Sequence, residues 1–291
     1  MPEPIVFQAH DNYVLALQFS HDGNTLISGG MDSLIRMWSV PGWEQVRIVE
    51  GHEHSVNTLA LSPGGDYFIS GSTDGTVRRW SFPGGDLLNT YRDRKKTVAA
   101  ARISADGNWV AGAYYGGRAA VWALDGETVA QIPASKKNLG GIAFSPDGRL
   151  IALSGLGDDI TLWSLPEGEL LGSLEGHSTA VTHLEFMAEG AQLISLGYDQ
   201  SIRFWDTSSW ELIRAVQSDK PGVRGLLLNQ DESLAALALE GLIQHFRVSD
   251  WSLAREIQAG AKVVSSMAFS PDGNLFVTGG ADKKIRVWEL N

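Results

Sequence analysis

The stretch GHEHSVNTLALSPGGDYFISGSTDGTVRRW, residues 51–80, decides the fold. It predicts three short strands at 56–61, 67–71 and 76–80, because apolar, β-branched and aromatic residues alternate with polar ones there. The intervening segments SPGG (62–65) and TDG (73–75) are typical of turns. Three such strands cannot cover their own apolar faces, so this stretch needs neighbours of the same kind.

Four residues of this stretch stand out as a polar set: His52, Ser70, Asp74 and Trp80. If the strands lie side by side, the Ser70 hydroxyl can bridge the imidazole to Asp74 and to the indole N–H of Trp80. Buried donors need acceptors, so we expect a hydrogen-bonded set inside the small sheet.

The unit repeats along the whole chain. An aromatic residue ends it seven times, at spacings of 41 or 42 residues, and a hairpin signal such as Asp106-Gly107 or Asp147-Gly148 recurs in phase. A period near 42 with four short strands per unit predicts propeller blades. The repeats end at Trp38, Trp80, Trp122, Trp163, Trp205, Phe246 and Trp288.

With these repeats, the chain resembles the WD-repeat (WD40) β-propeller family over nearly its whole length. The family's Gly-His opening is present as Gly51-His52 and Gly176-His177, and its Trp-Asp ending as Trp205-Asp206; the other tryptophans are followed by Ser, Ala or Glu. The resemblance implies an all-β protein, a seven-bladed β-propeller of four-stranded antiparallel blades. We expect one domain over residues 1–291.

The two ends of the chain complement each other. A strand-like segment at 4–7 precedes any complete blade, and the chain stops after a third strand at Trp288. The N-terminal strand should therefore join the last blade as its outer strand and close the ring, which removes exposed sheet edges.

The blades are unequal in their polar residues. Blades ending at Trp122, Trp163 and Phe246 carry Gly, Leu and Ala at the serine position and are expected to rely on apolar packing alone. The last blade has Thr278 and Asp282 but Gly260 at the histidine position. The full set occurs with identical spacing as His10/Ser28/Asp32/Trp38, His52/Ser70/Asp74/Trp80 and His177/Ser195/Asp199/Trp205.

A catalytic interpretation of His, Ser and Asp is possible but disfavoured. A hydrolase needs one exposed nucleophile, whereas this trio occurs three times on one repeat template with each serine in mid-strand. His52 and His54 alone are too few ligands for a metal site. There is no Walker-type loop and no Gly-x-Ser-x-Gly elbow. We expect no catalytic, metal-binding or cofactor-binding residues, and no enzyme activity.

Composition limits the partners. The net charge is −11, there is no cysteine, and no signal-peptide pattern or long apolar run is present. We expect a cytoplasmic protein that is a monomer by itself and does not enter membranes. Nucleic acid is not the expected partner, because the overall charge opposes attraction to phosphates.

The family resemblance implies a binding face. In this family the loops before the first strand and between the second and third strands bind peptides or partner proteins. The matching positions here are basic and rich in tyrosine, which suits an acidic or phosphorylated peptide, although loop lysines can also be merely solvated. The candidate face comprises Tyr13, His54, Lys95, Lys96, Tyr114, Tyr115, Lys136, Lys137, Tyr198, Lys220 and Lys262.

A second surface is conceivable. Trp43, Trp210 and Trp251 each follow the aromatic that ends a blade by five residues. We favour packing of each indole on its own outer strand, since amphipathic aromatics often lie flat on a sheet. The alternative is an exposed contact patch.

Together these features predict a non-catalytic protein-interaction scaffold. An alternative is a regulatory or docking module for an enzyme on another chain, and a third is a hydrolase or lyase built on the propeller channel. The sequence does not identify the partner, because this architecture serves many roles.

Overall fold

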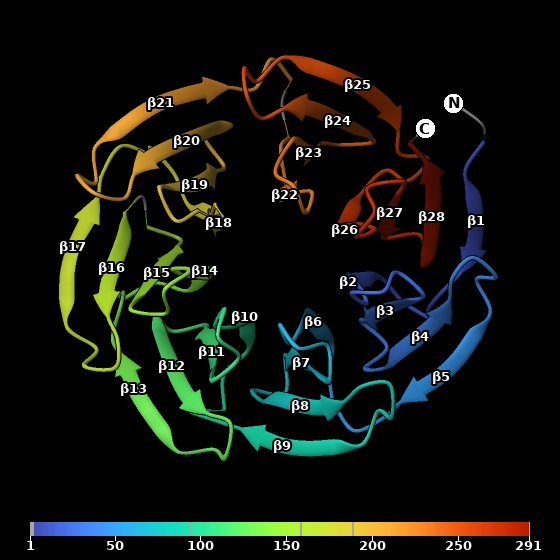
Figure 1. Ribbon diagram of the computed structural model, residues 1–291, viewed down its shortest axis with the longest axis horizontal. Coiled ribbons are helices and arrows are strands. Elements are labelled where there is room, and N and C mark those ends of the chain that lie inside the picture. The colour runs from blue at the N-terminus through green and yellow to red at the C-terminus, as the bar shows by residue number, and fades with distance from the viewer. Residues whose placement is uncertain (1–2, 94, 158, 188, 221, 291) are drawn as a thin grey trace. The chain divides into compact units, whose positions relative to one another are not determined.

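The computed structural model describes residues 3–93, 95–157, 159–187, 189–220 and 222–290. These residues form 28 strands in seven four-stranded antiparallel sheets, with no helix among them (Figure 1). Two compact units comprise residues 1–59 with 220–291 and residues 60–219. The prediction of a single domain stays a prediction.

The first unit holds three complete sheets. Their strands are β2 (Val14–Phe19), β3 (Thr25–Gly30), β4 (Ile35–Ser39) and β5 (Gln45–Val49); β22 (Gly225–Leu228), β23 (Leu234–Ala238), β24 (Leu242–Arg247) and β25 (Leu253–Gln258); and β26 (Val264–Phe269), β27 (Leu275–Gly280), β28 (Lys284–Glu289) and β1 (Ile5–Gln8).

The second unit also holds three complete sheets. Their strands are β10 (Val98–Ile103), β11 (Trp109–Tyr114), β12 (Arg118–Ala123) and β13 (Thr128–Ile132); β14 (Leu139–Phe144), β15 (Leu150–Gly155), β16 (Ile160–Ser164) and β17 (Leu170–Leu174); and β18 (Val181–Phe186), β19 (Gln192–Gly197), β20 (Ser201–Asp206) and β21 (Leu212–Gln217). The seventh sheet comprises β6 (Val56–Leu61), β7 (Tyr67–Ser72), β8 (Val77–Ser81) and β9 (Leu87–Tyr91).

The N-terminal strand completes the last blade, as predicted. β1 pairs antiparallel with β28, with Ile5 opposite Val287 and Gln8 opposite Lys284. The sheet order is β1-β28-β27-β26, so the chain's first strand is the outer strand of its last blade. The fold class is confirmed: the strands are those of a seven-bladed β-propeller with four-stranded antiparallel blades.

Alternation and turn chemistry explain the strands. The second strand of a blade is almost wholly buried, as in β11, whereas the fourth is largely exposed, as in β5. The turn from β10 to β11 shows how the hairpin signal works. The Ser104 hydroxyl donates to Asp106, and the N–H of Gly107, at φ 75°, donates to the Ser104 carbonyl. Glycine adopts this left-handed conformation without steric cost.

The core consists of apolar layers between neighbouring blades. In the second unit, Ala111 and Val121 of one blade share a cluster with Leu153 and Trp163 of the next. The described residues contain no helix long and apolar enough to cross a membrane.

Candidate functional site

The His/Ser/Asp/Trp set of blade β2–β5 is a buried chain of hydrogen bonds. The Trp38 indole N–H donates to Ser28 Oγ at 2.9 Å, and His10 Nε2 lies 2.8 Å from the same oxygen. Asp32 contacts His10 Nδ1 at 2.9 Å rather than the serine. In this blade the serine does not bridge to the aspartate, unlike the bridge expected between Ser70 and Asp74. The imidazole, with nitrogens on opposite sides of its ring, spans from the mid-strand serine to the aspartate in the β3–β4 turn.

The same arrangement recurs in blade β18–β21. Trp205 donates to Ser195 Oγ at 2.9 Å, His177 Nε2 lies 2.8 Å from that oxygen, and His177 Nδ1 lies 3.0 Å from Asp199. Burial lowers the pKa of His177, with Asp199 opposing that effect. Burial favours the neutral form of Asp199, but hydrogen bonds, chiefly from the Ser178 backbone N–H and from Ser201, outweigh it and hold its pKa at about 2. The carboxylate is therefore ionised at neutral pH.

Blade β6–β9 follows the pattern where its contacts are defined. The Trp80 indole donates to Ser70 Oγ at 2.7 Å, and His52 is buried. Asp74 accepts the backbone N–H of Thr76 at 2.9 Å and so also stabilises the β7–β8 turn.

These sets do not form a hydrolase site. Ser28, Ser70 and Ser195 have no exposed surface, and each accepts an indole N–H, so no substrate reaches the hydroxyl. The structure's described residues contain no group of three or more His, Cys, Asp or Glu side chains that could hold a metal ion.

The remaining blades do not rely on apolar packing alone, contrary to expectation. Trp163 donates to Thr161 Oγ1 at 2.9 Å, because Leu153 replaces the serine acceptor. In the neighbouring blade Arg118 Nε lies 3.5 Å from Asp93. A buried N–H or charge needs a partner whichever residues surround it.

The last blade lacks the histidine, and Arg286 contacts its aspartate as Arg36 contacts Asp32 in blade β2–β5. The Arg286 guanidinium donates to the Gly260 carbonyl at 2.8 Å and pairs with Asp282 at 2.6 Å. A Cβ on Gly260 would lie 2.7 Å from Arg286 Nε, so a side chain and this arginine compete for the same space.

The predicted loop face is partly assembled within the second unit. Lys95 and Lys96 lie in the loop before β10, and Lys136 and Lys137 in the loop before β14; all four are exposed. None of the four forms an ion pair with another described residue. Tyr115 is 46% exposed, in the β11–β12 turn beside them.

Backbone hydrogen bonds hold these loops together. The Tyr115 N–H donates to the Thr97 carbonyl, and the Leu156 N–H to the Asn138 carbonyl, both at 2.9 Å. The Gly116 N–H donates to the Asn138 side chain at 2.9 Å. Each turn between the second and third strands is therefore tied to a loop that precedes a first strand. Tyr198, 56% exposed, lies in the equivalent β19–β20 turn, whose N–H donates to Ala180.

One residue of the predicted face needs correction. Tyr114 is 1% exposed and packs edge-on against Trp122, so it belongs to the core, where burial raises its pKa. Lys220 is partly exposed and ion-paired with Glu256. In the first unit Tyr13, His54 and Lys262 are exposed, as predicted.

The three turn tryptophans pack on the sheets. Trp251 is 8% exposed and stacks on Phe246 at 5.5 Å between ring centroids, and Trp43 stacks on Phe7 at 6.0 Å. Trp210 is half-buried against the core cluster of its blade. All three indoles pack against the protein, but Trp43 stacks on the outer strand of the last blade and Trp251 on the third strand of its own blade, rather than each on its own outer strand.

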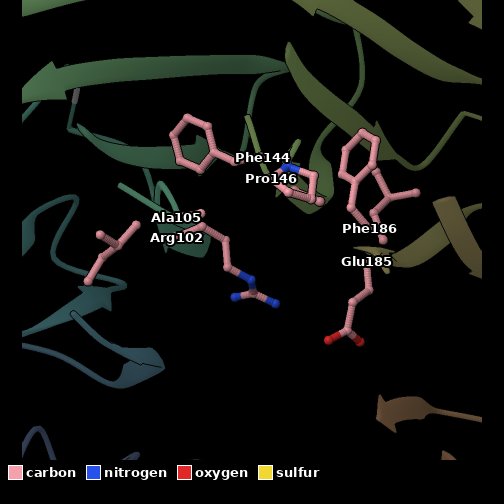
Figure 2. Close-up of a pocket in the computed structure, with 9 residues that line it drawn as sticks. Arg102, Ala105, Phe144, Pro146, Glu185 and Phe186 are labelled. Carbon is pink, nitrogen blue, oxygen red and sulfur yellow. The ribbon is translucent and has the colours of Figure 1, made fainter. Parts of the chain in front are cut away.

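A hollow that the sequence interpretation missed lies in the second unit. It has a volume of about 380 Å³ and is lined by the C-terminal ends of β10, β14 and β18 and the turns that follow them. Arg102 of β10 and Glu185 of β18 line it together with Phe144, Pro146 and Phe186 (Figure 2). The sequence held a signal: both charged residues occupy the strand position that Ala60, Ala143 and Ala268 occupy in other blades.

Family comparison agrees with this architecture. The family model described as "WD domain, G-beta repeat" matches residues 3–39, 43–81, 168–206 and 251–289, which is more than half of the chain. The chain belongs to the WD40 family. The four matched segments end at Trp38, Trp80, Trp205 and Trp288, so they include the three complete polar sets.

Several relatives of this WD40 chain are much longer proteins. It is 27% identical over 147 residues to apoptotic protease-activating factor 1 of Rattus norvegicus, covering 50% of this chain and 12% of the relative. It is 27% identical over 151 residues to pre-mRNA-processing factor 17 of Homo sapiens, covering 50% and 26%. With U3 small nucleolar RNA-associated protein 21 of Saccharomyces cerevisiae it shares 25% identity over 150 residues, covering 51% and 16%. The chain thus spans about a quarter or less of the length of these relatives.

Proposed function

We propose that this WD40 propeller is a non-catalytic interaction scaffold that binds an acidic or phosphorylated segment of a partner protein on its lysine loops. The lysine loops are those carrying Lys95, Lys96, Lys136 and Lys137. The observation that carries the proposal is the clustering of these four exposed cations in two neighbouring loops with no carboxylate paired to them in the described part of the chain.

The local structure suits such a ligand. Backbone hydrogen bonds tie the lysine loops to the turn of Tyr115, so less order has to be gained on binding. Tyr115 offers an exposed ring next to the cations, and tyrosine provides contact area at low entropic cost. In a protein of net charge −11 this cluster is a local positive site that favours negative ligands by charge complementarity.

The test uses defined peptides and a charge-reversed protein. Binding of a fluorescent phosphoserine-containing acidic peptide is measured by polarisation at two salt concentrations, against a neutral peptide of equal length. We expect the acidic peptide to bind more tightly, with affinity falling as salt rises. The variant Lys95→Glu/Lys96→Glu/Lys136→Glu/Lys137→Glu, checked for unchanged melting, should lose this binding.

A matched pair of single variants locates the effect. Lys137→Glu and Arg149→Glu each reverse one exposed charge, but Arg149 lies in the β14–β15 turn, at the other end of β14. Only Lys137→Glu should weaken binding of the acidic peptide. Equal weakening of binding by both variants would indicate a general charge effect and contradict the proposed site. Affinity capture from lysate with the wild type and the quadruple variant then identifies the natural partner, including a partner that is itself an enzyme.

A further inference from the structure

The hollow between β10, β14 and β18 presents two opposite charges that do not pair with each other. Arg102 and Glu185 extend from their strands to the same side in Figure 2. They lie on different blades with β14 between, and no ion pair joins them. The only hydrogen bond of the Arg102 side chain within the described structure runs to the Ala101 carbonyl at 3.0 Å. Glu185 accepts from His183 Nε2 at 3.2 Å.

The Arg102 side chain is partly buried and forms no ion pair with a carboxylate of the described residues. Burial lowers the pKa of the Arg102 guanidinium, and the charge of Glu185 opposes that effect. Removing a charge from water is costly unless another group compensates it. A guanidinium has five N–H donors, so most of its hydrogen-bonding capacity remains for a ligand.

The rest of the lining is apolar. Ile103, Phe144, Pro146 and Phe186 line the hollow together with the two charged residues. A concave, mainly apolar site with a few convergent polar groups is the usual form of a small-molecule site, and about 380 Å³ lies within the typical size range.

We propose that this hollow binds a small apolar zwitterion, with its carboxylate on Arg102, its ammonium group on Glu185 and its hydrophobic part against Phe144 and Phe186. A guanidinium recognises a carboxylate through two parallel hydrogen bonds. Glu185 disfavours a ligand that carries only negative charge, and Arg102 disfavours one that carries only positive charge. A free aromatic or aliphatic amino acid and a short apolar peptide with free ends share this chemistry.

This site is separate from the lysine loops. β10 runs from Val98, next to the loop of Lys95 and Lys96, to Ile103 in the hollow, so the two lie at opposite ends of one strand. Failure of one proposal therefore leaves the other intact.

Titration calorimetry of the full chain, with ligands up to about 10 mM, tests the charge requirement. The probes are L-phenylalanine, the dipeptide Phe-Phe, N-acetylphenylalanine and phenylalanine amide. We expect binding of at least one of the first two, and binding at least about tenfold weaker when its carboxylate or ammonium group is blocked. Whichever of L-phenylalanine and Phe-Phe binds more tightly shows whether the natural ligand is a free amino acid or a short peptide. No binding of either, or equal binding of blocked and free forms, overturns the proposal.

Substitutions test the two charged residues independently. Arg102→Gln should weaken the preferred zwitterion at least about tenfold and reduce the penalty for blocking the carboxylate. Glu185→Gln should do the same for the ammonium group. Arg149→Gln removes an exposed arginine outside the hollow and should leave affinity unchanged. If Arg102→Gln and Glu185→Gln melt like wild type and bind like wild type, the assignment is wrong. If either unfolds, the blocked-ligand series on wild type still decides.

Discussion

Blades β18–β21 and β14–β17 each bury a tryptophan at the same position but supply different acceptors for its indole N–H. In the first, Trp205 donates to Ser195, which is linked through His177 to Asp199. In the second, Trp163 donates to Thr161, two residues away on the same strand. Satisfying the indole therefore does not require the four-residue set. The set additionally ties the loop before the first strand to the turn between the second and third.

The difference has a structural consequence. Where histidine and aspartate are present, a side-chain bridge stabilises the loop end of the blade. The backbone hydrogen bond between the same two segments occurs in both kinds of blade, at Met31 and Tyr198 as at Tyr115 and Leu156, so in the blades without the set it remains without the side-chain bridge. The four lysines of the lysine loops lie in two blades that lack the His/Ser/Asp/Trp set.

The largest expected effect is that of Ser195→Ala in blade β18–β21. It removes the acceptor of the Trp205 indole and the partner of His177 Nε2, so two buried polar groups lose their contact. We expect a loss of about 2–4 kcal/mol in the free energy of unfolding, measured with urea. Ser173→Ala changes an exposed serine of β17 and should have almost no effect. A loss below about 1 kcal/mol for Ser195→Ala would contradict a tightly enclosed network.

The aspartate makes one blade sensitive to acid. The pKa of Asp199 falls from 3.8 to about 2 on folding. A lowered pKa stabilises the fold above about pH 4, and this contribution disappears as pH falls towards 2. It amounts to about 2 kcal/mol. The difference in unfolding free energy between wild type and Asp199→Asn should shrink by that amount from pH 5 to pH 2. A constant difference would show that Asp199 does not titrate as described.

Thr161→Val tests the hydrogen bond from the Trp163 indole to Thr161 in blade β14–β17. The substitution keeps the side-chain shape but leaves the Trp163 indole N–H without its acceptor. We expect a loss of about 1–2 kcal/mol from urea unfolding. The loss should not change between pH 5 and pH 2, since neither residue of this pair titrates there. A loss equal to that of Ser195→Ala would remove the contrast between the two blades.

The smallest expected effect concerns the turn before the outer strand. Gly168 adopts φ 69° there, and Trp210 holds the equivalent position at φ 59° in the next blade. Gly168→Ala should cost about 1 kcal/mol, because a Cβ disfavours the left-handed conformation. Gly172→Ala is the control, since a Cβ there meets nothing within 4 Å and its φ is not left-handed. Equal thermal unfolding midpoints for the two variants would contradict this explanation.

The contrast between Gly168 and Trp210 also shows what the sequence pattern could not predict. Tryptophan is unexpected at positive φ, and its spacing from the blade-ending aromatic gives no indication of that backbone conformation. Packing against the core cluster of its blade offsets the backbone strain at Trp210. Tyr114 shows the same limit: its loop position predicted exposure, yet its side chain turns inward against Trp122.

The sequence by itself determined the repeat, the strands, the closure of the last blade by β1 and the members of the polar sets, since these follow from local alternation, turn residues and a fixed period. Only the tertiary structure decided which atoms pair within the sets, which tyrosines are exposed, and that Arg102 and Glu185 enter one hollow. These depend on contacts between different strands, from 10 to 22 positions apart within the polar sets to about 80 positions between Arg102 and Glu185, where packing selects each side-chain direction.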